Sequence, residues 1–449
     1  MAKDDQGKTN GLLVDIAALS SAVGSAQPML PQKNDICGSH AENERECGPR
    51  RGRGAQKLLA NHTMLVEVIS ASVESDSSQE VDAIDHHNRP RLRRKLILSA
   101  LFDKYPQLVS LTKPLPCEVD LVDLYSCVHD VGMLQFLVHA WSKWEAMGPD
   151  WDEECCHPEW AKTDENKGIP PPMIPCHASF RRSSIERPST NVMGAIGYYC
   201  TDNMTPIVGS LVCELQEDAS IICSAVNHAF QGNTVVYAVT THPGHHANRD
   251  NYGGYCYLNN AALCATLIQK RLSNKQFNSK SRIGIIDIDY HCGNGTADIF
   301  YNNPDVFFAS IHCDPDIEYP FNAGYEDQNG EGDGKGTTLH VPLEAGATWD
   351  GAYKSALEKA MTAMMDFNIA GLVISIGLDT YLGDSVAMSK GGFKLSGNDY
   401  YELGHLMGEF LKGRNIPTVF VQEGGYKMDV VGQAAADVVG GFAIGASDD

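Results

Sequence analysis

The chain has 449 residues, of which 43% are hydrophobic, so it can bury a core as one large domain or as two or three smaller ones. Its formal net charge of −22 excludes a general nucleic-acid binder, because such a protein needs a basic surface against the phosphates. The acidic charge favours cationic ligands instead. The sequence contains no window of about 18 apolar residues, so we expect no membrane span.

Residues 1–61 differ in composition from the rest of the chain. They are rich in Gly, Ser, Ala and Gln, and their charges nearly balance, so the acidity belongs to residues 62–449. We predict a poorly ordered extension at 1–61 and one folded domain at 62–449. The basic run Pro49–Lys57 is either an address signal or a solvated linker, and we favour the linker. The first residues do not resemble a secretory signal, because they lack a basic segment followed by an apolar one.

The 14 cysteines are scattered and include no Cys-x-x-Cys pair. Four of them fall at positions where we predict core, namely Cys213, Cys223, Cys256 and Cys264. This usage indicates free thiols in a reducing compartment, and we predict a cytoplasmic location with the nucleus as the alternative. The adjacent Cys155 and Cys156 are the one pair that departs from the scattered pattern.

Apolar periodicity and turn residues predict an alternation of strands and helices. In chain order we predict strand Met64–Ile69, helix Arg89–Asp103, helix Val119–Trp144, helix Val208–Phe230, strand Thr234–Thr240, helix Leu258–Leu272, strand Ile283–Ile288, a helix from Ala297, strand Val306–Ile311, helix Ala352–Phe367, strand Gly371–Ile376, helix Tyr400–Lys412 and strand Pro417–Val421. Gly148–Pro188 and Asn322–Gly336 are predicted loops. The alternation predicts an α/β fold with a parallel sheet covered by helices on both faces.

Polar residues follow directly on the predicted strand Ile283–Ile288. Asp287, Asp289 and His291 alternate with apolar residues, so in an extended backbone all three side chains project to one side. The carboxyl end of a parallel strand is where open α/β sheets build their sites. Two carboxylates and an imidazole there predict a bound cation, in preference to an ordinary helix cap and a surface histidine.

Three other predicted strands also end in reactive side chains. A Pro-Gly bend after Thr240 leads into the adjacent imidazoles of His245 and His246, Asp379 follows the strand Gly371–Ile376, and Tyr426 follows a Gly-Gly turn. Each alone has an ordinary explanation, such as a helix-capping Asp or a packed turn Tyr. Together the four strand ends predict a single site.

The same residues belong to a series of recognisable motifs. The chain contains PGHHA (243–247), GGYCYLNNA (253–261), DIDYHCGNGTADIFY (287–301), FFASIH (307–312), SIGLDT (375–380) and EGGY (423–426). In this order they resemble the zinc-dependent histone deacetylase superfamily. Residues 128–144, 179–200 and 314–338 are similar to its acetylpolyamine amidohydrolase branch. The resemblance covers residues 64–449 and implies the arginase-like, three-layer α/β/α fold with a central, mainly parallel sheet.

The resemblance implies one zinc ion per chain, bound by Asp289, His291 and Asp379. Two carboxylates and one imidazole leave open positions, as a catalytic zinc site requires. Ureohydrolases share the fold but use two metals, and we find no second ligand set in the sequence. A potassium ion is also implied. Its ligands are then Asp287, Ser310 and Ile311, with the backbone carbonyls of Asp289 and His291.

The resemblance further implies the catalytic residues. His245 and His246 form a pair whose far ring nitrogens are held by Asp287 and Asn294, respectively. Because Asn294 is neutral, it does not stabilise an imidazolium, so we expect His246 to be the better general base near neutral pH. Tyr426 then donates a hydrogen bond to the developing oxyanion. The implied reaction is hydrolysis of an acetamide by metal-activated water, giving free amine and acetate.

Substrate recognition is the part in which the chain departs from its relatives. The implied substrate-binding residues are Gly254, Tyr255, Tyr319, Phe321 and Glu186, with core packing as the alternative role of the aromatic ones. Met193 stands where an acidic residue is typical of the polyamine branch, so cation recognition falls to Glu186 or to the acidic field of the protein. The segment Gly383–Phe393 is longer than usual and is expected to reshape the entrance.

We therefore predict a zinc-dependent amidohydrolase that removes acetyl groups from N-acetylated amines such as acetylpolyamines. One alternative is a protein lysine deacetylase acting on histones or other proteins, and a less favoured one is a catalytically silent acetyl-amine binding platform. The expected partners are small cationic acetylated amines or acetyl-lysine, with no direct nucleic-acid or membrane contact. The polyamine branch also suggests a homodimer.

Overall fold

The structure is a computed structural model of the chain. It describes residues 64–71, 89–114, 120–148, 151, 155–156, 170–175, 186–232, 234–273, 281–387 and 392–447. The chain divides into two units, Met1–Lys57 and Leu58–Asp449, and all described residues belong to the second. The extension and the basic run predicted within residues 1–61 lie outside the described residues, so both stay predictions.

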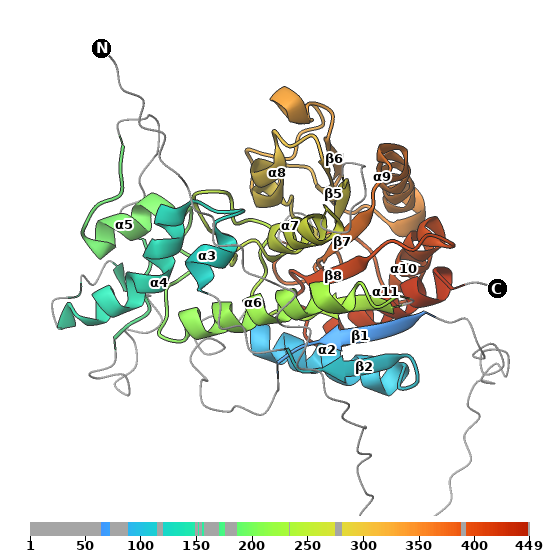
Figure 1. The fold of residues 1–449 in the computed structure, drawn as a ribbon, viewed down its shortest axis with the longest axis horizontal. Coiled ribbons are helices and arrows are strands. Elements are labelled where there is room, and N and C mark those ends of the chain that lie inside the picture. The colour runs from blue at the N-terminus through green and yellow to red at the C-terminus, as the bar shows by residue number, and fades with distance from the viewer. Residues whose placement is uncertain are drawn as a thin grey trace, which may run out of the picture. The chain divides into compact units, whose positions relative to one another are not determined.

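An eight-stranded sheet runs through the described part of the chain (Figure 1). Its strands are β1 (Leu65–Ile69), β2 (Val109–Thr112), β3 (Thr234–Ala238), β4 (Ile283–Asp287), β5 (Val306–Cys313), β6 (Thr338–Leu343), β7 (Gly371–Ile376) and β8 (Thr418–Gln422). Their order across the sheet is β2-β1-β3-β8-β7-β4-β5-β6, and every neighbouring pair is parallel. The predicted parallel sheet is confirmed.

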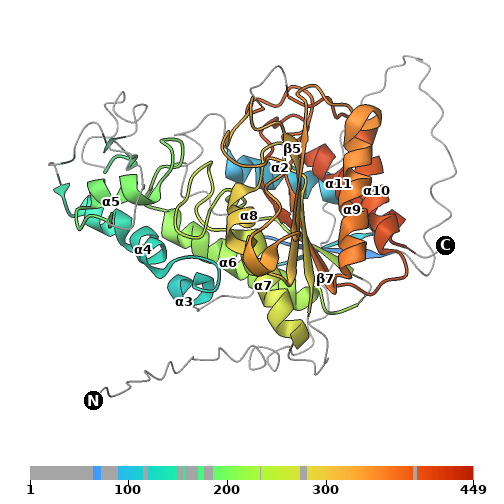
Figure 2. The same ribbon diagram turned by 90° about the horizontal axis from the view of Figure 1, so that it is seen from above.

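Helices cover both faces of this sheet, which is seen nearly edge-on in Figure 2. On one side lie α2 (Pro90–Lys104), α9 (Lys354–Phe367), α10 (Asn398–Leu411) and α11 (Val431–Gly445). On the other lie α3 (Leu121–Tyr125), α4 (Val131–Glu145), α5 (Val192–Tyr199), α6 (Leu211–His228), α7 (Asn260–Ser273) and α8 (Asn294–Phe300). A separate apolar core fills each side, so the three-layer α/β/α fold class is confirmed. No helix among the described residues meets the length and hydropathy of a bilayer span.

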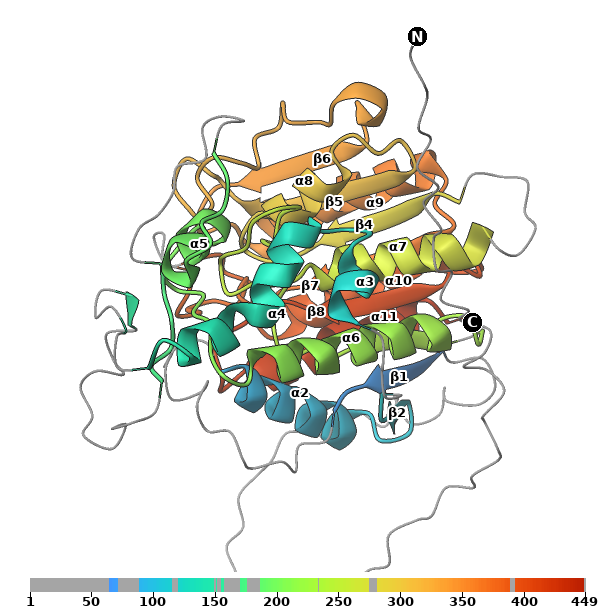
Figure 3. The ribbon, with the colours of Figure 1, turned by 60° about the vertical axis from the view of Figure 1, so that its left-hand side comes forward.

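The central strands are apolar because both of their faces are covered. Every residue of β4, β7 and β8 is buried, and their sequences IGIID, GLVISI and TVFVQ are correspondingly almost free of polar side chains. Figure 3 shows α6 and α7 running across one of these faces, with β6 and β2 toward opposite ends of the sheet. This near-continuous apolar signal explains why these strands were predictable from sequence.

The single helix predicted at Val119–Trp144 is wrong, because α3 and α4 are separate helices. Asp130 caps α4: its carboxylate accepts hydrogen bonds from the N–H groups of Gly132 and Met133. The N–H of Asp130 donates to the carbonyl of Arg249 at 2.6 Å, so it makes no hydrogen bond within α3. An aspartate that bonds its neighbours in this way starts a new helix rather than continuing the old one.

Among the elements that the sequence patterns missed are β2, β6 and α11. The two strands lie at the sheet edges, where β2 is short and half exposed and β6 contains Pro342, so neither gives a buried apolar run. The helix α11 carries glycines that weaken its helical signal. One of them, Gly441, packs against the backbone of Tyr401 on α10 so closely that a Cβ atom would collide with it.

Two expectations about cysteine are corrected. Cys213 is exposed rather than in the core, because it lies on the outer side of α6. Of the other three cysteines predicted in the core, Cys256 and Cys264 are buried free thiols and Cys223 is partly buried. Cys155 is disulfide-bonded, so the expectation of free thiols fails at this position.

The topology places four loops side by side. β3, β8, β7 and β4 are consecutive in the sheet although they are far apart in sequence, and all point the same way. Each carries, just after its carboxyl end, one of the polar segments singled out in the sequence. The carboxyl edge of these four strands is therefore where a site can form.

Candidate active site

The structure brings together Asp289, His291 and Asp379 at this edge. One potential ligand atom from each residue lies within 4.8 Å of the others, and all three residues are buried. Nδ1 of His291 is 2.9 Å from Oδ2 of Asp379 and 3.2 Å from Oδ1 of Asp289. Two carboxylates facing one imidazole nitrogen form a donor set that suits a divalent cation with open coordination positions.

Backbone groups hold both carboxylates in place. Oδ1 of Asp379 accepts a hydrogen bond from the N–H of Tyr290 at 2.9 Å, and Oδ2 of Asp289 accepts one from the N–H of Gly424 at 3.1 Å. The approach of Gly424 requires a glycine, because a Cβ atom there would lie 2.7 Å from Oδ2 of Asp289 and 3.0 Å from Oδ2 of Asp379. Gly377 is closer still to Asp289. These contacts fix the cluster before any ligand arrives.

The electrostatics of the cluster call for a cation. Burial and the neighbouring Asp289 carboxylate raise the pKa of Asp379 to about 7. Burial also opposes ionisation of Asp289, but the positive charges of His245 and His291 lower the pKa of that carboxyl below its usual range. Two buried carboxylates that compete for positive charge are stabilised by a bound divalent ion. The residues present therefore fit the zinc ion that the family resemblance implies.

Asp287 is not part of this three-residue cluster. β4 ends at Asp287, so the extended alternation assumed from the sequence does not continue through Asp289 and His291. Oδ2 of Asp287 lies instead 3.0 Å from Nδ1 of His245, and its Oδ1 accepts a hydrogen bond from the N–H of Asp289 at 3.1 Å. The prediction that all three side chains project together is wrong, and Asp287 contacts the histidine pair.

His245 and His246 lie on the loop after β3 with their ring centroids 4.0 Å apart. Nδ1 of His246 is 2.7 Å from Oδ1 of Asn294. The amide group of Asn294 donates in turn to Oδ1 of Asn248 at 3.2 Å, so its oxygen faces His246. Because an amide oxygen only accepts, His246 holds its hydrogen on Nδ1 and keeps a lone pair on Nε2.

The two histidines differ in charge. Burial alone would lower the pKa of His245, but the carboxylates of Asp289 and Asp287 raise it to about 10. Burial lowers the pKa of His246 well below 6.5, and the neighbouring His245 and His291 lower it further. Near neutral pH, His245 is thus protonated, whereas His246 is neutral and able to accept a proton.

Tyr426 follows β8 and is almost completely buried. Its N–H donates to Oδ2 of Asp384 at 2.7 Å, the guanidinium of Arg93 lies 5.5 Å from its ring centroid, and the ring of Tyr255 is 5.8 Å away. Burial raises the pKa of Tyr426 well above 10, and the carboxylates of Asp289 and Asp379 add to this. The phenol is therefore protonated and can donate a hydrogen bond.

Of the predicted substrate-binding aromatic residues, Tyr319 lies nearest the histidines. Its ring meets that of His246 edge to face, with centroids 4.8 Å apart. Phe321 is 52% exposed. Gly254 packs its backbone on the same imidazole, since a Cβ atom there would lie 2.5 Å from Cδ2 of His246. The N–H of the adjacent Tyr255 donates to Thr205 at 2.9 Å, which anchors the turn.

Glu423 is the main site residue that the sequence reasoning missed. Its Oε2 accepts hydrogen bonds from the N–H groups of Gly244 (2.6 Å) and His245 (3.1 Å), and its Oε1 accepts one from the hydroxyl of Ser375 (3.1 Å). Burial raises the pKa of Glu423 to about 7. It ties the loop after β8 to the loop after β3. The sequence did contain a signal for this residue, because Glu423 is an acidic residue directly after the buried strand β8.

Other predicted roles are not tested by these contacts. Ser310 and Ile311 are buried on β5, with Ser310 in register with Asp287 on β4, but their binding of potassium stays a prediction. Glu186 is partly buried ahead of α5, and its contact with an amine likewise stays a prediction. Residues 388–391 of the long segment Gly383–Phe393 lie outside the described residues.

The fold and the site together define a class of protein. A parallel α/β sheet holds at its carboxyl edge a buried Asp-His-Asp cluster, an imidazole with a free lone pair and a protonated tyrosine. This is the arrangement of a metal-dependent hydrolase. Residues 88–442 match the family model described as histone deacetylase domain, and the chain belongs to this family. Zinc dependence is a property of the family, and the chain is accordingly a hydrolase of the deacetylase class.

Three relatives illustrate the similarity. Acetylpolyamine amidohydrolase 1 of Pseudomonas aeruginosa is 36% identical over 316 residues, which is 70% of this chain and 81% of that protein. Histone deacetylase 10, chloroplastic, of Oryza sativa subsp. japonica is 34% identical over 211 residues, covering 46% of this chain and 44% of that one. The crystal structure of acetylpolyamine aminohydrolase from Burkholderia pseudomallei superposes on this chain with a TM-score of 0.67 at 24% sequence identity. The superposition covers 85% of this chain and 99% of that chain, so the two share a fold.

Proposed function

We propose that the chain hydrolyses the acetyl amide of small N-acetylated amines such as acetylpolyamines. The observation that carries this proposal is the position of the neutral His246 beside the Asp289, His291 and Asp379 cluster, with the His246 and His291 ring centroids 6.0 Å apart. A proton acceptor next to a buried divalent-cation site is the minimal machinery for adding water to an amide carbonyl.

Asp289, His291 and Asp379 would hold the zinc ion, which when bound polarises the acetyl carbonyl and lowers the pKa of a water ligand. His246 accepts the proton of the attacking water on Nε2, while Asn294 keeps Nδ1 protonated and the ring oriented. The same Nε2–H then donates the proton to the leaving amine. Tyr426 donates a hydrogen bond from its phenolic O–H to the oxyanion as negative charge develops on that oxygen.

His245 has a different role in this proposal. The carboxylates of Asp289 and Asp287 raise its pKa, so it does not compete with His246 as the base. Its charge stabilises the developing negative charge of the reaction centre. The backbone of His245 is held by Glu423, so the two imidazoles keep their relative position during turnover.

The choice of a small cationic amine rests on three supports. The chain carries a net charge of −22, and the relative from Pseudomonas is named an acetylpolyamine amidohydrolase and is matched over most of its length. The aromatic rings of Tyr319 and Tyr255 lie beside His246 and Tyr426, where they suit a methylene chain. Protein lysine deacetylation is the second candidate, favoured by the match to a relative named a histone deacetylase. A potassium ion and a homodimer belong to this proposal as predictions from the family resemblance.

The mechanism is tested with His246→Ala and Tyr426→Phe. We expect each to lower kcat by at least about a hundredfold while the zinc content per chain stays at the wild-type level, because neither residue is in the cluster. Zinc is measured by atomic absorption on the same samples. Unchanged turnover in both variants rules the mechanism out.

The substrate is tested by comparing kcat/KM on acetylputrescine, acetylspermidine and an acetyl-lysine peptide. We expect the two acetylated polyamines to be preferred. A strong preference for the peptide would overturn the substrate assignment without affecting the mechanism, because both substrates contain the same acetyl amide.

A further inference from the structure

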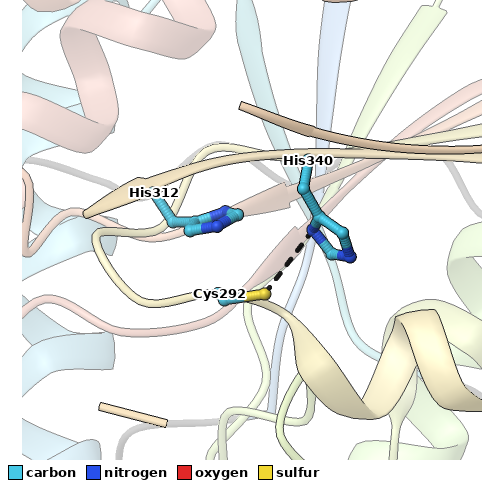
Figure 4. Close-up of side chains that lie close together, drawn as sticks. All are labelled: Cys292, His312 and His340. Carbon is cyan, nitrogen blue, oxygen red and sulfur yellow. Dashed lines mark hydrogen bonds between the residues drawn. The ribbon is translucent and has the colours of Figure 1, made fainter. Parts of the chain in front are cut away.

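A second buried cluster of metal-binding side chains lies beside the site just described (Figure 4). It consists of Cys292, His312 and His340. One potential ligand atom from each lies within 4.8 Å of the others, and Sγ of Cys292 is 3.7 Å from Nδ1 of His340. The three residues are 1%, 0% and 2% exposed, so the donors are held in the protein interior rather than on its surface.

Strand register brings the two histidines together. β5 and β6 are neighbouring parallel strands, and Ser310 of β5 is in register with His340 of β6. His312 lies two residues beyond Ser310 and therefore projects to the same face of the sheet. Cys292 comes from the loop after β4, which is the strand on the other side of β5. Figure 4 shows its sulfur next to the ring of His340, with the ring of His312 close by.

The hydrogen bonds of His312 fix its tautomer. Nε2 lies 2.9 Å from the carbonyl oxygen of Gly324, which can only accept, so the hydrogen is on Nε2. The lone pair is then on Nδ1, where the hydroxyl of Ser310 lies 2.8 Å away. Metal-binding histidines are typically held in this way, with the ring N–H donated to a backbone carbonyl. An ion at Nδ1 would take the place of the hydrogen bond that Ser310 donates there. A Cβ atom on Gly324 would collide with both Nε2 of His312 and Sγ of Cys292, so the glycine shapes this wall.

The partners of His340 are less complete. Among the described residues its only hydrogen-bonding contact is with Cys292, a weak one at 3.7 Å. A thiol is only a weak hydrogen-bond partner, so little is lost when Cys292 and His340 bind an ion in place of each other.

We propose that Cys292, His312 and His340 form a second metal site, for a soft or borderline ion of the Cu(I) or Zn(II) kind. A thiolate and two imidazoles select these ions, whereas the site has no carboxylate that would favour Mg²⁺, Ca²⁺ or Mn²⁺. The Asp-His-Asp cluster has the opposite composition, so the two sites differ in the ions they prefer.

The role of this second site is structural. Cys292 directly follows His291, so an ion bound to it ties the loop that carries His291 to β5 and β6. Its binding energy adds to the stability of the folded state, because the unfolded chain does not hold the three donors together. The second site does not depend on the reaction assigned to the first.

The decisive measurement is Co(II) titration of the metal-depleted full-length chain. The Asp-His-Asp site has no sulfur ligand, so a thiolate-to-Co(II) charge-transfer band in the near ultraviolet reports a thiol site. Comparison with Cys292→Ser then separates Cys292 from the other buried thiols, including Cys256 beside His245 and Glu423. We expect the band in the wild type and in Cys264→Ser, which removes a buried thiol of α7 outside the cluster, and not in Cys292→Ser. A wild type without the band, or a Cys292→Ser chain that keeps it, overturns the proposal.

Titrations with Zn(II) and with Cu(I), each against a competing chelator, then identify the ion. We expect the preferred ion to bind at least tenfold more weakly to Cys292→Ser and His340→Asn than to the wild type, with circular dichroism confirming that the variants are folded. The variant Asp289→Asn/Asp379→Asn should keep the Co(II) thiolate band although it loses the first site. If this variant loses the thiolate band, the two sites are not independent, and the proposal is contradicted. If the band persists, the second site binds metal whether or not the first site and its proposed reaction are intact.

Discussion

Nδ1 of His246 lies 2.7 Å from the amide oxygen of Asn294, whereas Nδ1 of the adjacent His245 lies 3.0 Å from a carboxylate oxygen of Asp287. The two imidazoles are buried side by side, yet one has a neutral partner and the other a charged one. Burial lowers the pKa of both imidazoles, but the carboxylates of Asp289 and Asp287 raise that of His245 to about 10, whereas the neighbouring His245 and His291 lower that of His246 further. Asn294 contributes to the difference because it gives His246 a neutral partner in place of a carboxylate.

The first prediction changes that partner. Asn294→Asp gives His246 a carboxylate, which raises the pKa of its imidazole. Because the base must be neutral to accept a proton, the acid limb of the kcat/KM profile should move to higher pH, with about a tenfold loss near pH 6. The profile is measured between about pH 5 and 9. Recovery toward wild-type activity at high pH is expected, and an equal loss at every pH would point to a structural defect instead.

The second prediction concerns the glycine that lies against the metal cluster. Gly424→Ala places a Cβ atom 2.7 Å from Oδ2 of Asp289 and 3.0 Å from Oδ2 of Asp379, so the carboxylates must move apart. We expect zinc affinity to fall at least about tenfold, measured by competition with a chelator. Gly413→Ala is the control, since nothing lies within 4 Å of its Cβ position. Its φ of +70° strains an alanine locally, but its zinc affinity should be unchanged. Equal affinities in the two variants would contradict the close approach.

The third prediction concerns Asp384, whose Oδ2 accepts hydrogen bonds from the N–H groups of Tyr426 (2.7 Å) and Lys427 (2.8 Å). Asp384→Ala frees the turn that positions the phenol, so kcat should fall roughly ten- to a hundredfold with KM and zinc content nearly constant. Steady-state kinetics and metal analysis check this. Asp429→Asn is the matched control, because the Asp429 side chain is 72% exposed. Its one ion pair among the described residues is with Lys427, at 3.6 Å. A similar loss of kcat in that variant would refute the positioning role.

The fourth prediction is a pH dependence of stability. His129 is buried, its Nδ1 is 2.8 Å from the carbonyl of Asn248, and its Nε2 accepts a hydrogen bond from the N–H of Asn259 at 2.8 Å. Burial lowers the pKa of His129 to about 4. The unfolded chain therefore binds this proton first as the pH falls, and the stability contributed by His129 is complete above about pH 6.5 and lost toward pH 4.

This loss amounts to roughly 3 kcal/mol in the free energy of unfolding. The variant His129→Gln can make both hydrogen bonds without titrating, so its stability should fall less steeply between about pH 6.5 and 4. Urea unfolding at several pH values measures the difference in slope. Parallel curves for the wild type and the variant would show that His129 does not contribute.

Much of the fold was predictable from sequence, and the reason is burial. β3, β4, β7 and β8 are central strands, and a strand covered on both faces must be apolar along its length, which leaves a local signal. The edge strand β6, with Pro342, left no such signal. The break at Asp130 between α3 and α4 was missed because apolar periodicity continues across it while the backbone does not.

The candidate site was predictable as a set of residues but not as a geometry. Its side chains follow the ends of buried strands, so the motifs named Asp289, His291, Asp379 and the two histidines directly. Asp287 was misplaced because the strand ends at that residue, and side-chain alternation holds only while the backbone stays extended. Glu423 was missed because its contacts with Gly244, His245 and Ser375 link the loop after β8 to the loop after β3 and to strand β7.

The sequence by itself determined the class of fold and the chemical inventory of the site, because burial and side-chain chemistry are properties of single segments. Only the tertiary structure decided which of those groups meet. The sheet order β3-β8-β7-β4 brings distant strand ends to one edge, and the register of β5 on β6 places His312 and His340 near Cys292. No periodicity within a segment encodes such pairings, since they follow from contacts between residues far apart along the chain.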